Sequence, residues 1–186
     1  DCCGVSDGSA AAIVTRADMA KKFRPDPIRV KALQIALSSG EELMYTKWDG
    51  AHVETTYRGG KLAYKEAGVK NPREEISMAE VHDCFSIAEI LHIEDLGFFK
   101  PGEGYKAVEE GLTRLDGSKP INTSGGLKCK GHPVGATGTG QLVEIWKQLR
   151  GEAGERQVPV KDLRVGATQS LGGTGGTCTL TILERR

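Results

Sequence analysis

Residues 124–138, SGGLKCKGHPVGATG, are the stretch of sequence that says most about the fold. The stretch is rich in glycine, and His132 stands in it between Gly131 and Pro133. Glycine lets a backbone approach a ligand closely and proline stiffens a turn, so we predict a rigid loop that fixes the direction of His132. Residues 138–150 follow with their apolar side chains on one side of a helix, whose N-terminus would favour anions.

A phosphate-binding loop of another kind is the main alternative for this stretch. The sequence lacks the G-x-x-x-x-G-K-[ST] pattern, however, and a G-x-G-x-x-G loop would need a preceding strand and an acidic residue downstream. We therefore favour a rigid loop that carries a catalytic histidine.

Residues 81–85, VHDCF, form a second candidate loop between a predicted strand (76–81) and a predicted buried helix (85–96). The imidazole of His82 and the thiol of Cys84 lie two residues apart beside a helix N-terminus, which suits proton transfer. A helix N-terminus can also lower the pKa of a thiol. The alternative is a hydrogen-bonded core histidine beside an inert buried cysteine, and the pentapeptide alone leaves both open.

Residues 170–176, SLGGTGG, form a predicted turn between two strands, 163–169 and 177–183. The backbone N–H groups of such a turn can form an oxyanion hole, which contributes about 3 kcal/mol or more in acyl transfer. Ordinary hairpin geometry explains the glycines of this turn equally well.

The rest of the chain alternates between predicted strands and helices. Further elements are a short helix (18–23), a strand (28–37), a helix ended by Gly68 (60–67) and a short extended segment (119–123). Residues 9–14 suit a buried strand or a tightly packed helix, and residues 38–56 are predicted to form a loop. The order of elements predicts an α/β layered domain, with a mixed five-stranded sheet covered by helices.

The composition excludes several partners. Lys and Arg number 25, as do Asp and Glu, so the formal net charge is zero. This balance gives no electrostatic reason to expect nucleic acid or a membrane surface as partner. No apolar run approaches the roughly 20 residues that a membrane span needs. A chain of 186 residues with 38% hydrophobic and 27% charged residues is ordinary for one globular domain.

The cysteines are odd in number and lack the spacing of a metal site, so no metal is expected. They are Cys2, Cys3, Cys84, Cys129 and Cys178. With no signal peptide visible, reduced thiols and a cytoplasmic location are the better expectation. The chain starts at Asp1 rather than Met, and we expect that upstream sequence is trimmed or missing.

The order of VHDCF, SGGLKCKGHPVGATG and SLGGTGG closely resembles the C-terminal domain of thiolases. It is most similar to the sterol-carrier-protein-type and archaeal branch, in which HDCF replaces the NEAF motif of other thiolases. Residues 148–158, QLRGEAGERQV, are similar to that branch too. The resemblance implies a thiolase-like layered fold, in which residues 1–26 end the N-terminal domain with its last strand region and residues 27–186 form the C-terminal domain.

Thiolases exchange an acyl group between coenzyme A and an acyl-CoA carbon nucleophile, and so form or cleave a carbon–carbon bond. The resemblance implies that a cysteine of the N-terminal domain carries the acyl group and that His132 activates it. His82 would line the same oxyanion hole. Cys84 would act as acid and base on the α-carbon, and the backbone N–H of Gly172 would serve the second oxyanion hole.

One departure from the family pattern concerns Ser170, which stands where most thiolases place their acid–base cysteine. A serine hydroxyl is a poor base near neutral pH, so this role moves to Cys84. Cys129 and Cys178 are predicted to be structural. The adjacent Cys2 and Cys3 do not match the nucleophile motif of the family.

The resemblance therefore implies an acyl-CoA C-acyltransferase, inactive as this chain alone because the nucleophile lies upstream. Residues predicted to bind coenzyme A, a substrate and not a covalently bound cofactor, are Ser124, Gly125 and Gly126. Expected partners are the N-terminal thiolase domain, a second copy or three further copies of the protein, and a small zinc-ribbon/OB-fold protein. Alternatives are a thiolase-like carbon–carbon lyase (aldolase) and a non-catalytic thiolase-like subunit.

Overall fold

The structure is a computed structural model that describes residues 2–40 and 49–185. In chain order its elements are α1 (Ala17–Phe23), β1 (Arg29–Leu37), α2 (Glu54–Ala67), α3 (Pro72–Glu75), β2 (Met78–Glu80), α4 (Ser86–Asp95), α5 (Gly104–Glu109), α6 (Gly126–Lys130), α7 (Thr137–Arg150), the 3₁₀ helix η1 (Gly154–Arg156), β3 (Val165–Gly172) and β4 (Thr177–Glu184). None of the helices within these described ranges combines the length and the apolar character needed to cross a bilayer.

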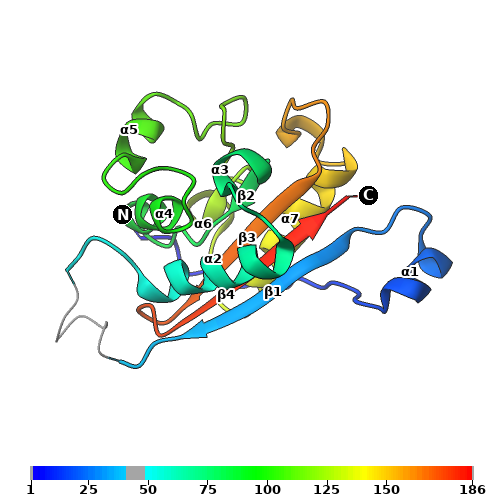
Figure 1. Ribbon diagram of the computed structural model, residues 1–186, viewed down its shortest axis with the longest axis horizontal. Helices are drawn as coiled ribbons and strands as arrows, with labels where there is room; N and C mark the ends of the chain where they lie inside the picture. The colour runs from blue at the N-terminus through cyan, green and yellow to red at the C-terminus, as the bar shows by residue number, and fades with distance from the viewer. Residues whose placement is uncertain (1, 41–48, 186) are drawn as a thin grey trace.

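The strands form one mixed sheet in the order β1-β4-β3-β2 (Figure 1). β4 runs antiparallel to both β1 and β3, while β2 and β3 are parallel. The β3–β4 hairpin therefore occupies the centre of the sheet, and the loop that follows β2 lies beside the C-terminal half of β3.

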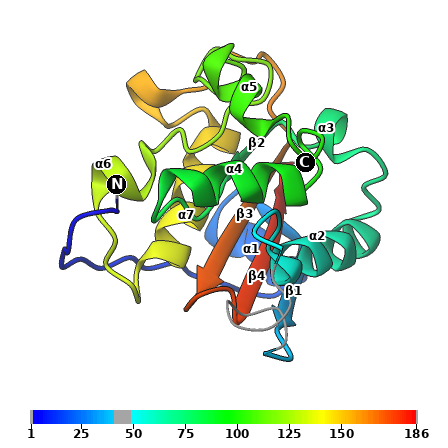
Figure 2. The same ribbon diagram turned by 90° about the vertical axis from the view of Figure 1, so that its left-hand side faces the viewer.

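Helices cover the two faces of the sheet separately (Figure 2). On one face α2 and α4 enclose a core that contains Ala167, Leu180 and Ile182. On the other face α7 packs Ile145 and Leu149 against a smaller core. Because side chains alternate between the two faces of a strand, the consecutive residues Ile182 and Leu183 of β4 belong to different cores. The α/β layered architecture predicted from the sequence is present.

The prediction of five strands is wrong for the part of the chain that the structure describes, where the sheet has four. The fifth predicted strand, residues 119–123, makes a single bridge, between Ile121 and Ala79. Asn122 explains this, because it adopts a left-handed φ of 52° and turns the chain away from the sheet. Its side-chain oxygen accepts the N–H of Val81, so the turn is held in place.

Most other predicted elements are confirmed, including β1, α4, α7 and the β3–β4 hairpin. α2 ends at Gly68 in a left-handed conformation, as predicted, but it begins six residues before the expected start. Gly59 and Gly60 obscured its pattern, and both make close contacts: a Cβ at these positions would lie 3.2 Å from Leu180 and 3.1 Å from Leu96. α3, α5 and α6 were not predicted. Of the predicted loop 38–56, residues 41–48 lie outside the described residues and residues 54–56 belong to α2.

The prediction that residues 9–14 form a buried strand or helix is wrong. The segment has no regular secondary structure, and Ile13 and Val14 are 95% and 81% exposed. A strand needs a neighbour for its N–H and C=O groups, and within the described residues no strand runs beside this segment.

One face of β1 is apolar and uncovered. α2 covers the face that contains Ala32 and Ala36, whereas Leu33, Ile35 and Leu37 on the opposite face are 53%, 60% and 68% exposed. α7 lies on that side of the sheet but packs mainly against β3 and β2. A row of large apolar side chains at this exposure is the kind of surface that another part of a protein covers.

The partly buried carboxyl of Asp95 makes the stability of the domain depend on pH, and this dependence can be tested. It accepts the N–H of Val53 at the start of α2, and its burial raises the pKa of its carboxyl from 3.8 to about 7, with contributions from Glu94 and Glu54. Between these pH values the native state binds more protons than the unfolded state, so stability falls as pH rises. Asp95→Asn keeps the acceptor and removes this dependence.

We therefore expect Asp95→Asn to raise the stability of the full-length protein at about pH 8 by about 1 kcal/mol or more, and to have little effect below about pH 4. The difference in Tm between variant and parent, measured across this range, checks it. The control is Asp162→Asn, at an aspartate whose side chain is 57% exposed. An equal gain at both pH values, or the same profile in the control, would contradict this origin.

Candidate active site

A hydrogen bond to the side chain of Asp83 joins two of the predicted loops. Asp83, in the VHDCF loop, accepts the backbone N–H of Leu127 at 2.8 Å in the first turn of α6. Gly126 makes this approach possible, because a Cβ there would lie 2.0 Å from Asp83 Oδ2. The loop after β2 and the loop before α7 are therefore held side by side.

The two candidate histidines meet where these loops come together. The rings of His82 and His132 are in edge-to-face contact, with centroids 4.9 Å apart and an angle of 83° between their planes. Their positions are 50 residues apart in the chain. Each loop therefore contributes one imidazole to a common site.

Thr137, the first residue of α7, sets the protonation of His132. Its hydroxyl lies 2.6 Å from His132 Nδ1 and donates to the carbonyl oxygen of Pro133 at 3.2 Å. A hydroxyl has one proton to donate, so toward the histidine it acts as acceptor and Nδ1 carries the proton. Neutral His132 then presents the lone pair of Nε2, which is the form that a general base needs.

The N-terminal segment is hydrogen-bonded to both loops. The N–H of Cys3 donates to the carbonyl oxygen of Cys84, and the hydroxyl of Ser6 accepts the N–H of His132 at 2.8 Å. Gly131 leaves room for Ser6, since a Cβ there would lie 2.4 Å from the hydroxyl oxygen. This segment therefore contributes to the backbone geometry of the site although it lies outside the layered core.

His82 is almost fully buried, at 5% exposure. Burial, reinforced by the neighbouring His132, lowers the pKa of His82 to about 4. Its backbone N–H donates to Gln169 Oε1 on β3. At neutral pH His82 is therefore an uncharged imidazole, which can donate one hydrogen bond from whichever ring nitrogen carries the proton.

Cys84 departs from one expectation. Its thiol is partly buried, and this burial raises the pKa of Cys84, although the N–H of Phe85 at the start of α4 acts in the opposite direction. The lowering predicted from the helix N-terminus is therefore outweighed by desolvation, to which nearby Cys3 and Asp83 add. Cys84 is a protonated thiol at neutral pH, which is the form that can donate a proton.

The third predicted loop reaches the same region through Ser170. A Cβ at Gly138, the second residue of α7, would lie 3.4 Å from the Ser170 hydroxyl oxygen, so this end of β3 lies against the helix that holds His132. Gly172 lies two residues further along, exposed at the end of β3.

The residues predicted to bind coenzyme A have other contacts in the domain. The Ser124 hydroxyl donates to Glu80 Oε2 at 2.6 Å and accepts from Lys130 Nζ at 2.8 Å. Glu80 is 1% exposed, and burial raises its pKa. Gly125, before α6, adopts a left-handed φ of 91°. These contacts explain the residue types on structural grounds, so coenzyme A binding at Ser124, Gly125 and Gly126 stays a prediction.

Several residues that shape the site were not predicted from the sequence. Asp83 and Thr137 lie inside the motifs, and Thr137 was detectable as the residue directly before the predicted helix 138–150, five positions after His132. Ser6 and Gln169 gave no signal, because each reaches its histidine across a long stretch of chain, 126 and 87 residues respectively.

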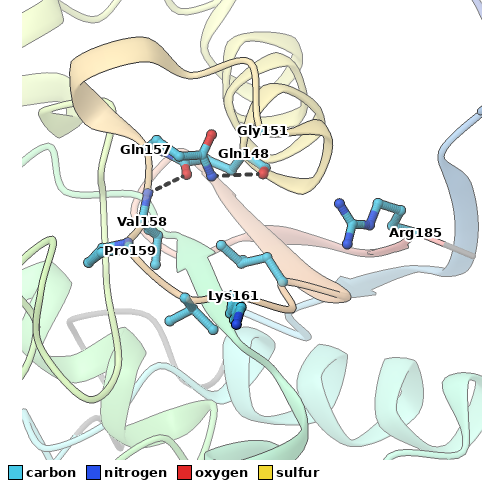
Figure 3. A pocket seen from close by; sticks show the side chains of 9 residues that line it. Gln148, Gly151, Gln157, Val158, Pro159, Lys161 and Arg185 are labelled. Atoms are coloured by element: carbon cyan, nitrogen blue, oxygen red, sulfur yellow. Dashed lines mark hydrogen bonds between the residues drawn. The ribbon is translucent and has the colours of Figure 1, made fainter.

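Two surface hollows differ in their relation to the histidines. One, of about 440 Å³, lies between the N-terminal segment and Pro133–Ala136, next to the loop of His132. The other, of about 450 Å³, lies at the end of α7 around Gln148 and Arg185 (Figure 3). There Gln148 is bound to Gln157 and to the N–H of Val158, so its polar groups are already paired.

In residues 2–40 and 49–185 no cluster of three acidic, histidine or cysteine side chains could hold a metal ion.

Comparison with known proteins identifies the family. The model of a family described as thiolase C-terminal domain-like matches residues 36–185. An acetyl-CoA acetyltransferase of Methanothermobacter thermautotrophicus is 47% identical over the whole chain, which covers 47% of that protein. Sterol carrier protein 2 of Bos taurus is 37% identical over 98% of the chain, which covers 33% of it. The chain thus spans about half the length, or less, of these relatives.

A solved structure of an Ltp2-ChsH2(DUF35) aldolase shares the fold. It superposes with a TM-score of 0.74 over 86% of this chain and 40% of its own, at 21% sequence identity. A likeness at this identity shows the fold alone, whereas the archaeal and sterol-carrier relatives match the branch predicted from VHDCF. The chain therefore belongs to the thiolase superfamily and carries its C-terminal domain.

Proposed function

We propose that this domain is one half of the active site of an acyl-CoA C-acyltransferase of the thiolase type. The observation that carries the proposal is the ring contact of His82 with His132, at 4.9 Å, with Cys84 two residues from the first histidine. The two rings supply a base and a neutral hydrogen-bond donor in contact with each other, and Cys84 supplies a protonated thiol in the same loop as His82.

His132 takes the part of the base. Its Nδ1–H is bound to Thr137, so Nε2 is available to remove the proton of a cysteine nucleophile. That cysteine is expected in the half of the protein that the relatives have in addition to this domain. The thiolate attacks the keto carbon of a 3-ketoacyl-CoA, and the bond between this carbon and the α-carbon breaks. The acyl group is then held as a thioester, and the carbanion of the shortened CoA ester leaves.

His82 and Gly172 take the part of oxyanion donors. Neutral His82 can donate to a thioester oxygen without carrying a charge of its own, and the backbone N–H of Gly172 serves the second oxyanion hole. Each donor of this kind contributes about 3–4 kcal/mol to transition-state stabilisation.

Cys84 takes the part of acid and base at the α-carbon. Burial keeps its thiol protonated, so it can donate a proton to the carbanion that leaves when the carbon–carbon bond breaks. In the reverse direction the thiolate removes the same proton. Ser170, at the position that the thiol occupies in most thiolases, has no comparable acidity.

The acyl-CoA substrate is proposed to lie along the hollow beside Pro133–Ala136 and to approach the turn of Ser124, Gly125 and Gly126. Lys130, already bound to Ser124 and Glu80, adds positive charge on this side of the loop. Which acyl chain is accepted depends on surfaces outside these loops.

The other half of the protein is proposed to cover the apolar face of β1. Leu33, Ile35 and Leu37 form a row there, and the relatives have about as many residues again as this chain. The same packing would bring the nucleophile to Nε2 of His132. The domain alone is therefore expected to lack activity.

The test compares two reactions of the full-length protein. We expect CoA-dependent cleavage of acetoacetyl-CoA and no CoA-independent retro-aldol cleavage of a β-hydroxyacyl thioester. The isolated domain, residues 1–186, is the matched control and is expected to be inactive. Retro-aldol cleavage alone would indicate a carbon–carbon lyase. No activity in either assay would indicate a non-catalytic subunit. Thiolysis by the isolated domain would overturn the proposal that the nucleophile lies in the other half of the protein.

A further inference from the structure

A second histidine lies buried behind His82. His92, on α4, is fully buried, and its Nε2 has no hydrogen-bond partner among the described residues. His82 Nδ1 is in the same situation. Two buried imidazole nitrogens without partners are uncommon, since a buried polar atom left unpaired costs about 1–3 kcal/mol.

The side chain of Gln169 links the two histidines, and its orientation follows from one contact. The backbone N–H of His82 can only donate, so the atom that it meets at 2.9 Å is Gln169 Oε1. The amide nitrogen Nε2 therefore points the other way and donates to Thr56 Oγ1 at 3.1 Å. Gln169 and Thr56 are both fully buried.

Thr56 in turn determines the tautomer of His92. Its hydroxyl oxygen accepts a hydrogen bond from Gln169 Nε2 and can donate its own proton to His92 Nδ1 at 3.2 Å or to Cys178 Sγ at 3.6 Å. An imidazole nitrogen is a far better acceptor than a thiol, and Cys178 already accepts from Gln169. His92 Nδ1 is thus the acceptor, and the proton of neutral His92 is on Nε2.

Both rings are uncharged at neutral pH. Burial lowers the pKa of His92 to about 3, and His82 contributes to this lowering. The hydrogen bonds through Gln169 and Thr56 hold the two histidines in the same part of the core. His92 Nε2–H is a donor without a partner, and His82 Nδ1 can accept. These two atoms do not form a hydrogen bond with each other. A buried water between them could accept from the donor and donate to the acceptor.

We propose that His92 is a positioning residue for His82: its Nε2–H donates through one buried water to His82 Nδ1 and so holds the proton of His82 on Nε2. This inference rests on the proposed function, in which His82 donates to a substrate oxygen. With the opposite tautomer, the proton of His82 would be on the buried nitrogen, and the ring would have only a lone pair at Nε2. The chain Gln169–Thr56–His92 therefore selects the tautomer that an oxyanion donor requires.

The direct test is the ¹⁵N spectrum of the full-length protein with labelled histidine, with His82 assigned by comparison with His82→Gln. We expect the signal of a protonated Nε2 and an unprotonated Nδ1 for His82, and the same for His92. Protonation of His82 on Nδ1 would overturn the proposal. Because this readout needs no substrate, it stands or fails separately from the proposed reaction.

Thr56→Val tests the coupling without removing a histidine. The variant loses the donor to His92 Nδ1, and we expect His82 to show both tautomers and kcat to fall by about tenfold with KM unchanged. Thr56→Ser restores the hydroxyl and should recover most of kcat. Thr55→Val is the matched control, since Thr55 is also buried at the start of α2 but donates to the carbonyl oxygen of Gly175. An unchanged His82 tautomer in Thr56→Val, or an equal effect of Thr55→Val, would refute the coupling.

Discussion

In the full-length protein, His132→Ala is expected to lower the rate of acetoacetyl-CoA thiolysis by about 10³-fold, because the base that removes the proton of the nucleophile is lost. The loss corresponds to about 4 kcal/mol of transition-state stabilisation. Acylation of the protein by labelled acyl-CoA should fall to a similar extent. Both rates are measured on the same preparation, so that a defect in the first half-reaction is seen directly.

His52→Ala is the control for this variant. His52 lies before α2, with 41% of its side chain exposed, and belongs to neither of the loops that meet at the site. We expect it to retain thiolysis within about twofold, as surface substitutions do. If His132→Ala left acylation of the protein untouched, the assignment of His132 as base would be wrong.

Cys84→Ala is expected to separate the two half-reactions. The carbon–carbon step should slow by about 10³-fold, since the acid at the α-carbon is missing, while acylation of the nucleophile by acetyl-CoA continues. The variant should therefore still become labelled by acetyl-CoA, because acylation of the nucleophile does not require Cys84. Measuring label and carbon–carbon cleavage side by side checks this.

Two further variants sharpen the interpretation of Cys84. Cys129→Ala removes an exposed thiol next to Lys128 and Lys130 and should leave both rates unchanged. Combining Cys84→Ala with Ser170→Cys places a thiol at the position used by most thiolases, against the start of α7, and should recover part of the carbon–carbon step. Loss of acylation in Cys84→Ala, or a full rate without the thiol, would contradict the proton-transfer role.

Much of the fold was predictable because its signals are local. The apolar side of α7, the left-handed Gly68 at the end of α2 and the glycine turn between β3 and β4 each depend on residues within one or two turns of chain. The motifs around His82 and His132 were found for the same reason. Local pattern misled in two segments. Residues 9–14 have no neighbouring strand among the described residues, and in residues 119–123 the left-handed Asn122 turns the chain away from the sheet.

The sequence by itself determined four strands, the longer helices, the glycine-rich loops and the choice of the two candidate histidines. Only the tertiary structure decided that these histidines touch, which nitrogen of His132 carries its proton and which polar groups lie behind His82. The contacts responsible, such as Gln169 with Thr56, join residues up to 113 positions apart. Such pairs leave no periodic pattern in the sequence, because they are selected by the packing of two faces of one sheet and by the need of each buried polar atom for a partner.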